Sequence, residues 1–252
     1  MGRVGCVTWA LFIVAVPLFL VTASVTWAFN SPGLYNDGFE KYSISRISGI
    51  TDTDLRQVGA DIRSYINSGD EPLSVQTRIL GEKRDLFNDR EVAHMKDVKQ
   101  LVRGVYVLAL VSAVYLAAMT VVGFALQRGR FVPGLAKRMA LGGGLTLALL
   151  VVFGIVALVG FDGVFLKFHQ LSFANDFWRL DPRTDYLVRI FPQDFWFDAT
   201  MWVAVRAIVG ALVLTVAGSS FLVYRRYTGW QRELSGLESA RGLIWINLGY
   251  RP

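Results

Sequence analysis

The sequence predicts an all-α polytopic membrane protein, with four transmembrane helices, a small α+β extracytoplasmic cap and an aromatic-rich extracytoplasmic loop. Hydrophobic residues make up 53% of the chain and its mean hydropathy is +0.41, which is far above the soluble average. Four apolar stretches also reach the length of about 20 residues that a helix needs to cross a bilayer. These stretches lie at about residues 7–28, 104–126, 139–161 and 199–224.

The distribution of basic residues predicts the orientation of the four spans. The tail 225–252 is mainly basic, whereas 29–103 and 162–199 are slightly acidic. The connection 127–138 has no acidic residue and four basic ones: Arg128, Arg130, Lys137 and Arg138. Basic residues concentrate on the cytoplasmic side of membrane proteins. We therefore expect a bacterial cytoplasmic membrane protein with both termini in the cytoplasm and the cap and loop outside.

Two other interpretations of the composition are not favoured. The net charge of +6 arises from the same asymmetry, so it does not indicate binding to nucleic acid. The first apolar stretch could be a signal peptide, but it is longer than such a segment and lacks a small-residue cleavage site. We expect it to be retained as a helix.

The predicted cap covers residues 30–100. Thr51 and the residues after it supply N-cap side chains for an amphipathic helix. Residues 73–80 alternate apolar and polar side chains, and Gly81-Glu82-Lys83 then turns the chain back, which predicts a short hairpin. A region this small with so little apolar content is marginal alone, so we expect it to pack on the helix ends.

The approach to the second span has its own helix signal. Asn88-Asp89-Arg90-Glu91 has the sequence of a capping box. It predicts a helix that begins there and continues into the second span without a break.

The predicted loop covers residues 162–198 and combines aromatic with acidic side chains. Its ten aromatic residues favour the headgroup level of the membrane, so we expect the loop to lie along the outer interface. A plain anchoring belt does not require the polar residues that it also carries. These are His169, Asn175, Asp176, Asp181, Asp185, Asp194 and Asp198. The mixture indicates a site that contacts lipid.

The chain has two histidines, His94 and His169, each just outside a span on the same predicted side. Histidine can both accept and donate a proton near neutral pH. We expect the two rings to converge in one outward-facing pocket that opens toward lipid, as the acid and the base of one reaction. Rings more than about 12 Å apart with no pocket between them would contradict a shared site.

Four polar or aromatic residues are candidates to support the histidines. Asp97 lies one helical turn from His94 and could orient its ring, or form an ordinary surface pair with a neighbouring lysine. Asp176 falls on the helical face of His169 and could orient that ring, or cap a local turn. Asn175 and Trp178 lie beside Asp176 and are candidates to bind the substrate.

A further candidate, Arg206, lies about 10 Å inside the fourth span. A charge at that depth is costly and is by default functional. Arg206 could hold an oxyanion or lipid carbonyls, or pair with an aspartate of the loop. The alternative is a side chain that extends to the outer interface.

An extended set of segments resembles the lipoprotein intramolecular transacylase family, Lit. The resemblance covers roughly residues 5–225, and the tail from Gly229 to Pro252 lies outside it. Its segments are His94-Met95-Lys96-Asp97-Val98, Phe168-His169, residues 175–182 reading Asn-Asp-Phe-Trp-Arg-Leu-Asp-Pro, and residues 191–198 reading Phe-Pro-Gln-Asp-Phe-Trp-Phe-Asp. The loop motif is specific, whereas the topology of four spans is not.

This resemblance implies an activity. Lit enzymes are membrane acyltransferases that move the sn-2 acyl chain of a diacylglyceryl-cysteine lipoprotein to its own N-terminal α-amine, giving an N-acyl lyso-form. The family relies on two histidines, and His94 and His169 match them. The implied partners are the diacylglyceryl lipoprotein and membrane lipid. We expect no cofactor, because acyl transfer within one molecule needs neither redox chemistry nor an activated donor.

Two other functions compete with the transacylase. One is a non-enzymatic accessory or sensor protein whose aromatic loop binds lipid or a partner. The other is a metal-dependent hydrolase that uses His94, Asp97, His169 and Asp176, although no His-Glu-x-x-His spacing supports it. The residues alone leave open which histidine is the base and which is the acid.

Overall fold

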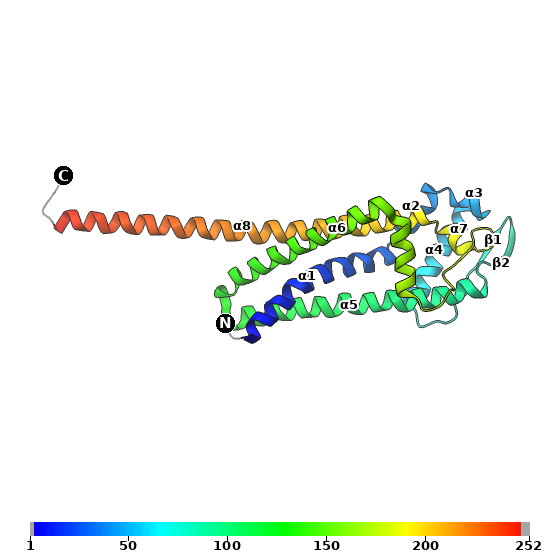
Figure 1. Ribbon diagram of the computed structural model, residues 1–252, viewed down its shortest axis with the longest axis horizontal. Helices are drawn as coiled ribbons and strands as arrows, with labels where there is room; N and C mark the ends of the chain where they lie inside the picture. The colour runs from blue at the N-terminus through cyan, green and yellow to red at the C-terminus, as the bar shows by residue number, and fades with distance from the viewer. Residues whose placement is uncertain (1–2, 248–252) are drawn as a thin grey trace.

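The computed structural model describes residues 3–247, with side chains described over 7–229 and at 231. The molecule is an elongated bundle of long helices that carries a small cap at one end (Figure 1). The predicted fold class is confirmed. Four helices are long and apolar enough to cross a membrane: Val7–Asn30, Asp89–Arg130, Val132–Ser172 and Gln193–Gly229.

The bundle is organised around its first helix. Helix α1 (Arg3–Asn30) contacts α5 (Asp89–Gln127), α6 (Val132–Ser172) and α8 (Gln193–Asn247). Helices α6 and α8 also pack along each other. The first apolar stretch therefore forms a structural part of the bundle.

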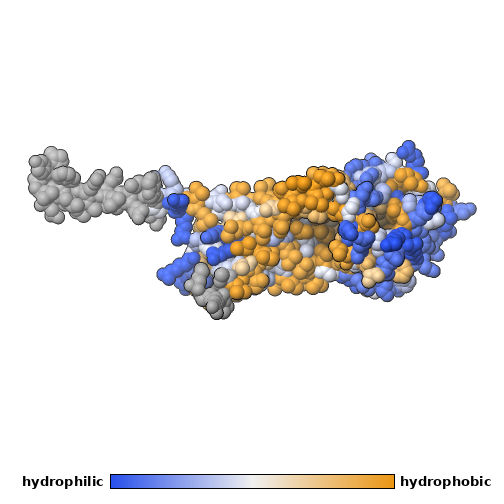
Figure 2. Space-filling view, in the orientation of Figure 1, coloured by the Kyte–Doolittle hydropathy of each residue, from blue (hydrophilic) through white to orange (hydrophobic). Residues whose placement is uncertain are grey.

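The hydropathy of the surface follows this arrangement. Apolar residues form a continuous band over the long helices, and polar residues cover the cap (Figure 2). The short 3-10 helix η1 (Arg128–Arg130), which joins α5 to α6, lies at the end opposite the cap (Figure 1). Helix α8 continues as far as Asn247, and residues 248–252 of the predicted tail lie outside the described residues.

The cap contains three helices and one hairpin. The helices are α2 (Pro32–Lys41), α3 (Ile44–Ser48) and α4 (Asp52–Asn67), and Thr51 caps α4 as predicted by accepting from the Asp54 backbone N–H. Strands β1 (Gln76–Ile79) and β2 (Glu82–Asp85) are antiparallel.

The hairpin turn lies earlier than the sequence predicted. It is formed by Leu80 and Gly81, which both have positive φ, at 52° and 88°. Two residues with positive φ form the tight turn that matches the twist of a hairpin. Leu80 is held in this unusual conformation for a side chain by its backbone N–H, which donates to the Gly49 carbonyl (2.9 Å).

One apolar core joins the cap to the bundle. It combines side chains of α2 to α4 and the hairpin with others from the start of α5, from the short helix α7 (Tyr186–Ile190) and from the start of α8. The cap therefore packs on the helix ends, as expected from its low apolar content.

Helix α6 is kinked at Gly160, which has non-helical angles (φ −160°, ψ 63°). Beyond the kink the helix resumes and turns across the end of the bundle toward α5 (Figure 1). The Asp162 carboxylate holds the start of this section by accepting from Gln193 Nε2 (2.6 Å). The section ends at Ser172, so the expectation that Asp176 shares a helical face with His169 is wrong.

Candidate active site

His94 lies in the second turn of α5. Both halves of the predicted capping box are formed: the Asn88 side chain accepts from the Arg90 and Glu91 backbone N–H groups, and the Glu91 carboxylate accepts from the Asn88 backbone. The His94 side chain is 6% exposed, and its Nδ1 is buried with no hydrogen-bond partner among the described residues. Such orphaned polar atoms are rare and typical of functional sites.

His169 lies in the last turn of α6, after the kink, and is 8% exposed. Its Nδ1 lies 2.8 Å from the Phe165 carbonyl oxygen. A carbonyl oxygen only accepts, so this nitrogen carries the proton in the neutral ring. The Nε2 atom of His169 then keeps its lone pair, which a general base uses to accept a proton.

The rings of His94 and His169 lie 6.0 Å apart, centroid to centroid, at an interplanar angle of 34°. This separation satisfies the 12 Å limit for a shared site. Phe173 contacts both rings, at 5.1 Å from His94 and 5.6 Å from His169. The kink in α6 therefore brings together two histidines that are 75 positions apart in the chain.

Aromatic rings surround the rest of His169. Phe165, Phe168 and Trp178 lie at centroid distances of 4.3, 5.3 and 5.3 Å from it. These rings and Phe173 form the aromatic cage of His169. Trp178 is the only one of the four that the sequence singled out. The density of aromatic residues predicts a loop at the membrane interface, but it does not show which rings contact His169.

Both histidines lie outside the apolar sections of their helices, at the cap end. Burial lowers the pKa of His94 to about 4; the neighbouring His169 lowers it too, while the Asp97 carboxylate raises it. Burial also lowers the pKa of His169, against the hydrogen bond to Phe165, which raises it. Both rings are therefore neutral at pH 7.

Three contacts hold the loop against the start of α5. Glu91 Oε1 accepts from the Leu187 backbone N–H (2.6 Å), and burial raises the pKa of this carboxyl group. Asn88 Nδ2 donates to Asp185 Oδ1 (3.0 Å). Arg90 Nη2 donates to the Asp176 carbonyl (2.9 Å). The capping box thus positions the loop as well as the helix.

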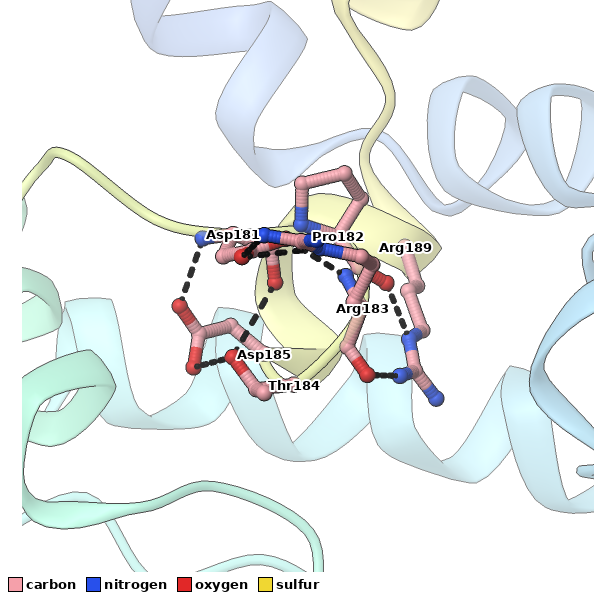
Figure 3. Close-up of polar contacts among 6 residues, drawn as sticks. All are labelled: Asp181, Pro182, Arg183, Thr184, Asp185 and Arg189. Atoms are coloured by element: carbon pink, nitrogen blue, oxygen red, sulfur yellow. Dashed lines mark hydrogen bonds and ion pairs between the residues drawn. The ribbon is translucent and has the colours of Figure 1, made fainter.

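The far side of the loop is folded on itself (Figure 3). The Asp181 carboxylate binds the Arg183 guanidinium, with 2.7 Å between Oδ2 and Nη2, which lowers the pKa of Asp181 to about 2. Asp185 Oδ2 accepts from the Asp181 backbone N–H (2.7 Å), and Arg189 Nε donates to the Pro182 carbonyl (2.6 Å). This turn presents Asp185 to Asn88.

The predicted supporting carboxylates contact other partners than the histidines. Asp97 Oδ2 accepts from Asn175 Nδ2 (2.8 Å), so its influence on His94 is electrostatic and it forms no hydrogen bond that orients the ring. Asn175 Oδ1 accepts in turn from the Phe177 backbone N–H (3.1 Å). Asp176 is exposed and pairs with Arg179 (3.1 Å), because it lies in the turn after α6.

Arg206 is placed in a different environment. Its guanidinium carbon lies 2.8 Å from the ring centroid of Trp27 and 4.2 Å from that of Trp202. It lines a groove between α2 and α8. The structure therefore groups Arg206 with this groove and not with the histidine pair.

The side chains that a metal-dependent hydrolase would use, His94, Asp97, His169 and Asp176, do not form a metal site. Within the part of the chain that the structure describes, no group of three or more His, Cys, Asp or Glu side chains could hold a metal ion. Asp97 and Asp176 have the partners given above.

Two features of the surface lie near the pair. A pocket of about 520 Å³ at the start of α5 is lined by Asp89, Arg90, Ala93, Asp176 and Phe177. Its surface is mainly apolar and neither histidine lines it, so it is not the shared histidine pocket expected from the sequence. Beyond the kink of α6, Leu166, Phe168 and Leu171 are exposed, Leu171 to 86%, which gives an apolar surface next to His169.

Comparisons with known proteins identify the family of the chain. Residues 10–196 match the family described as lipoprotein intramolecular transacylase Lit. An uncharacterized protein of Aquifex aeolicus (strain VF5) is 32% identical over 155 residues, which are 58% of this chain and 64% of that protein. This match spans less than two thirds of the relative's length.

The fold is similar to solved structures. The membrane-integral lipoprotein intramolecular transacylase Lit of Bacillus cereus matches with a TM-score of 0.72 at 15% identity, covering 92% of this chain and 100% of that one. A variant of the same protein, with a histidine replaced by alanine, matches with a TM-score of 0.71 at 14% identity, covering 90% and 97%. The family match covers most of the chain, and the chain belongs to the lipoprotein intramolecular transacylase family Lit.

Proposed function

We propose that this protein moves the sn-2 acyl chain of a diacylglyceryl-cysteine lipoprotein to the α-amine of the same cysteine. The observation that carries the proposal is the pair of buried, neutral histidines 6.0 Å apart at the cap end of the bundle. Family membership supports the same reaction class.

The reaction needs positioning first. Direct attack of the amine on the sn-2 ester closes a ring of about eight atoms, which is entropically unfavourable unless both ends are held. The exposed apolar residues Leu166, Phe168 and Leu171 suit acyl chains. The pocket at the start of α5, which carries the charged side chains of Asp89 and Arg90, suits the peptide end of the lipoprotein. Holding both ends can contribute several kcal/mol to lowering the barrier.

His169 carries the proton in this mechanism. Its Nε2 lone pair accepts a proton from the α-amine as the new N–C bond forms, since Nδ1 is already committed to the Phe165 carbonyl. The same imidazolium then gives that proton to the glycerol oxygen as the C–O bond breaks. Atoms balance within one molecule, and no covalent intermediate on the protein is required.

His94 stabilises the tetrahedral intermediate. With a pKa of about 4 its ring stays neutral, so it acts as a hydrogen-bond donor to the oxyanion. Its Nδ1 is buried, so we assign the donation to Nε2–H. Asp97 and Asn175 position the segment that follows α6 beside this ring.

We further propose that the cap end faces the outside of a bacterial cytoplasmic membrane, with both termini in the cytoplasm. The support is the basic connection around η1, which lies at the end opposite the cap. The lipoprotein and the surrounding lipid would then meet the site from the outer leaflet.

The test is conversion of lipoproteins in a bacterium whose own lipoproteins are diacylated with free α-amines. The wild-type protein should produce N-acyl lyso-forms, seen by mass spectrometry as acyl migration without net mass change. His169→Ala should abolish conversion, and His94→Ala should lower it by at least about 100-fold.

Gln170→Ala and Lys96→Ala are the matched controls, because both side chains are exposed and lie next to the histidines in sequence. They should retain activity, and all four variants should reach the membrane in equal amounts. Unacylated N-termini with the wild type, or full activity of His169→Ala, would sink the transacylase and leave a non-enzymatic lipid-binding protein.

A further inference from the structure

A groove lies between α2 and α8. Its volume is about 730 Å³, and it shares no lining residue with the pocket at the start of α5. Its lining includes Asp37 and Lys41 from α2 and Val205, Arg206 and Val209 from α8. The transacylase mechanism uses none of these residues.

Arg206 is the residue that demands an explanation. It is exposed, two helical turns beyond Asp198 and inside the apolar part of α8. Among the described residues it forms no ion pair, and its partners are the faces of Trp27 and Trp202. Cation–π contacts leave the guanidinium N–H groups free to bind an anion. An unpaired charge at this depth is costly unless an anion meets it.

The outer part of the groove offers the opposite charge. Lys41 is not free, because its ammonium group pairs with Asp198, which also accepts from the Tyr42 hydroxyl (2.6 Å). Asp37 is exposed and forms no ion pair within the described part of the chain. The groove therefore presents one free cation on the membrane side and one free carboxylate on the cap side.

Apolar side chains of α8 line the groove on either side of Arg206 in the sequence. Val205 and Val209 are 59% and 55% exposed and lie one turn apart on α8. The groove therefore combines a carboxylate on α2, a guanidinium on α8 and apolar side chains next to the guanidinium.

We propose that this groove binds a phospholipid with a primary-amine headgroup, of the phosphatidylethanolamine type. The phosphate binds Arg206, the ammonium binds Asp37 and an acyl chain lies along Val205 and Val209. Because Lys41 and Asp198 pair with each other, an anionic headgroup without an amine would give the Asp37 carboxylate no cationic partner. A diacylglyceryl lipoprotein has no phosphate for Arg206, so the occupant differs from the proposed substrate.

The test uses the full chain, purified in detergent, stripped of lipid and titrated with dioleoyl phosphatidylethanolamine under native mass spectrometry. Arg206→Gln and Asp37→Asn should each weaken binding about ten-fold, as expected for the loss of one charge-assisted contact. Phosphatidylglycerol and phosphatidylcholine should bind the wild type more weakly. Asp37→Asn should abolish the preference for ethanolamine over glycerol, whereas Arg206→Lys should retain part of the affinity.

Arg56→Gln and Asp52→Asn are matched charge changes on α4, outside the groove, and should not alter binding. Equal binding of phosphatidylethanolamine by the wild type and both groove variants would overturn the proposal. Equal affinity for phosphatidylglycerol, or a site filled by inorganic phosphate in place of the lipid, would also overturn it. If Arg206→Gln does not fold, Asp37→Asn decides alone, because this side chain lies on the exposed surface of the cap. The measurement needs no acyl transfer, so its outcome is separate from that of the transacylase test.

Discussion

The aromatic cage of His169 has two physical effects on the imidazole. It excludes water from a ring that changes its protonation state in the proposed mechanism, and it leaves one backbone carbonyl, that of Phe165, to fix the position of the proton. His94 lacks such a partner at Nδ1. The two histidines are thus chemically unequal, although each lies just outside a predicted span on the same side.

The pH dependence of the reaction should show the lowered pKa values. The attacking α-amine must be neutral and titrates at about 8. Below that pH the logarithm of the rate should rise with a slope of about one. The histidines must also be neutral. Burial places both of their pKa values below 6.5, so protonation of a histidine should lower the rate further only below that pH.

Initial rates of N-acylation measured in detergent between about pH 5 and 9 check this expectation. The slope should approach two only in the acid part of the range. A profile that already steepens at or above pH 6.5 would mean that the histidines titrate as solvated groups.

At this scale the sequence predicted the pair but not its partners. His94 and His169 could be identified because histidine is rare in this chain and both lie next to spans. The role of Asp176 was missed because it depends on where α6 ends. Because α6 ends at Ser172, the residues after it no longer follow the helical spacing that would place Asp176 beside His169.

Among the elements, the kink of α6 at Gly160 has the largest effect on the site. A straight continuation of α6 would extend away from the bundle, whereas the kinked section crosses to α5 (Figure 1). Glycine is about 1 kcal/mol less favourable than alanine inside a helix. Its presence therefore lowers the cost of interrupting the helix at this point.

Gly160→Ala should favour the straight helix and lower the rate of acyl transfer by up to about five-fold. Gly163→Ala is the matched control, since both positions have open space around the added methyl group and Gly163 lies in the regular helix. The control should keep full activity and equal or better thermal stability. Equal rates for the two variants would show that the backbone at Gly160 does not set the position of His169.

Element by element, the local signals of the sequence were accurate where they depend on neighbouring residues. The capping box at Asn88, the cap at Thr51 and the hairpin were all identified. The kink was not identified, because glycines inside apolar helices commonly serve close helix packing and the sequence does not give the backbone angles of any one of them.

For the whole molecule, the prediction with the widest consequences is the orientation in the membrane. Cys6 is the one cysteine of the sequence, and Cys6→Ser removes its thiol. In that background, Lys83→Cys in the hairpin should react with a membrane-impermeant maleimide in intact cells. Arg130→Cys in η1 should react only after lysis. Both native side chains are exposed, so differences in labelling report sidedness. The reverse pattern would contradict the orientation.

Composition and the four apolar stretches were sufficient to predict the membrane class, because a bilayer imposes both length and hydropathy on a spanning helix. They could not predict the groove between α2 and α8. That groove depends on how the cap packs against the bundle, which involves residues more than 150 positions apart.

The placement of the two histidines also bears on biosynthesis. His94 lies in the second turn of α5, on the cap side, and the chain returns to that side only after α6 has crossed the membrane. A molecule in which α6 failed to insert would leave His169 on the opposite face of the bilayer from His94. In the proposed mechanism, acyl transfer therefore requires a chain with all four helices inserted, and a misinserted copy should have no activity.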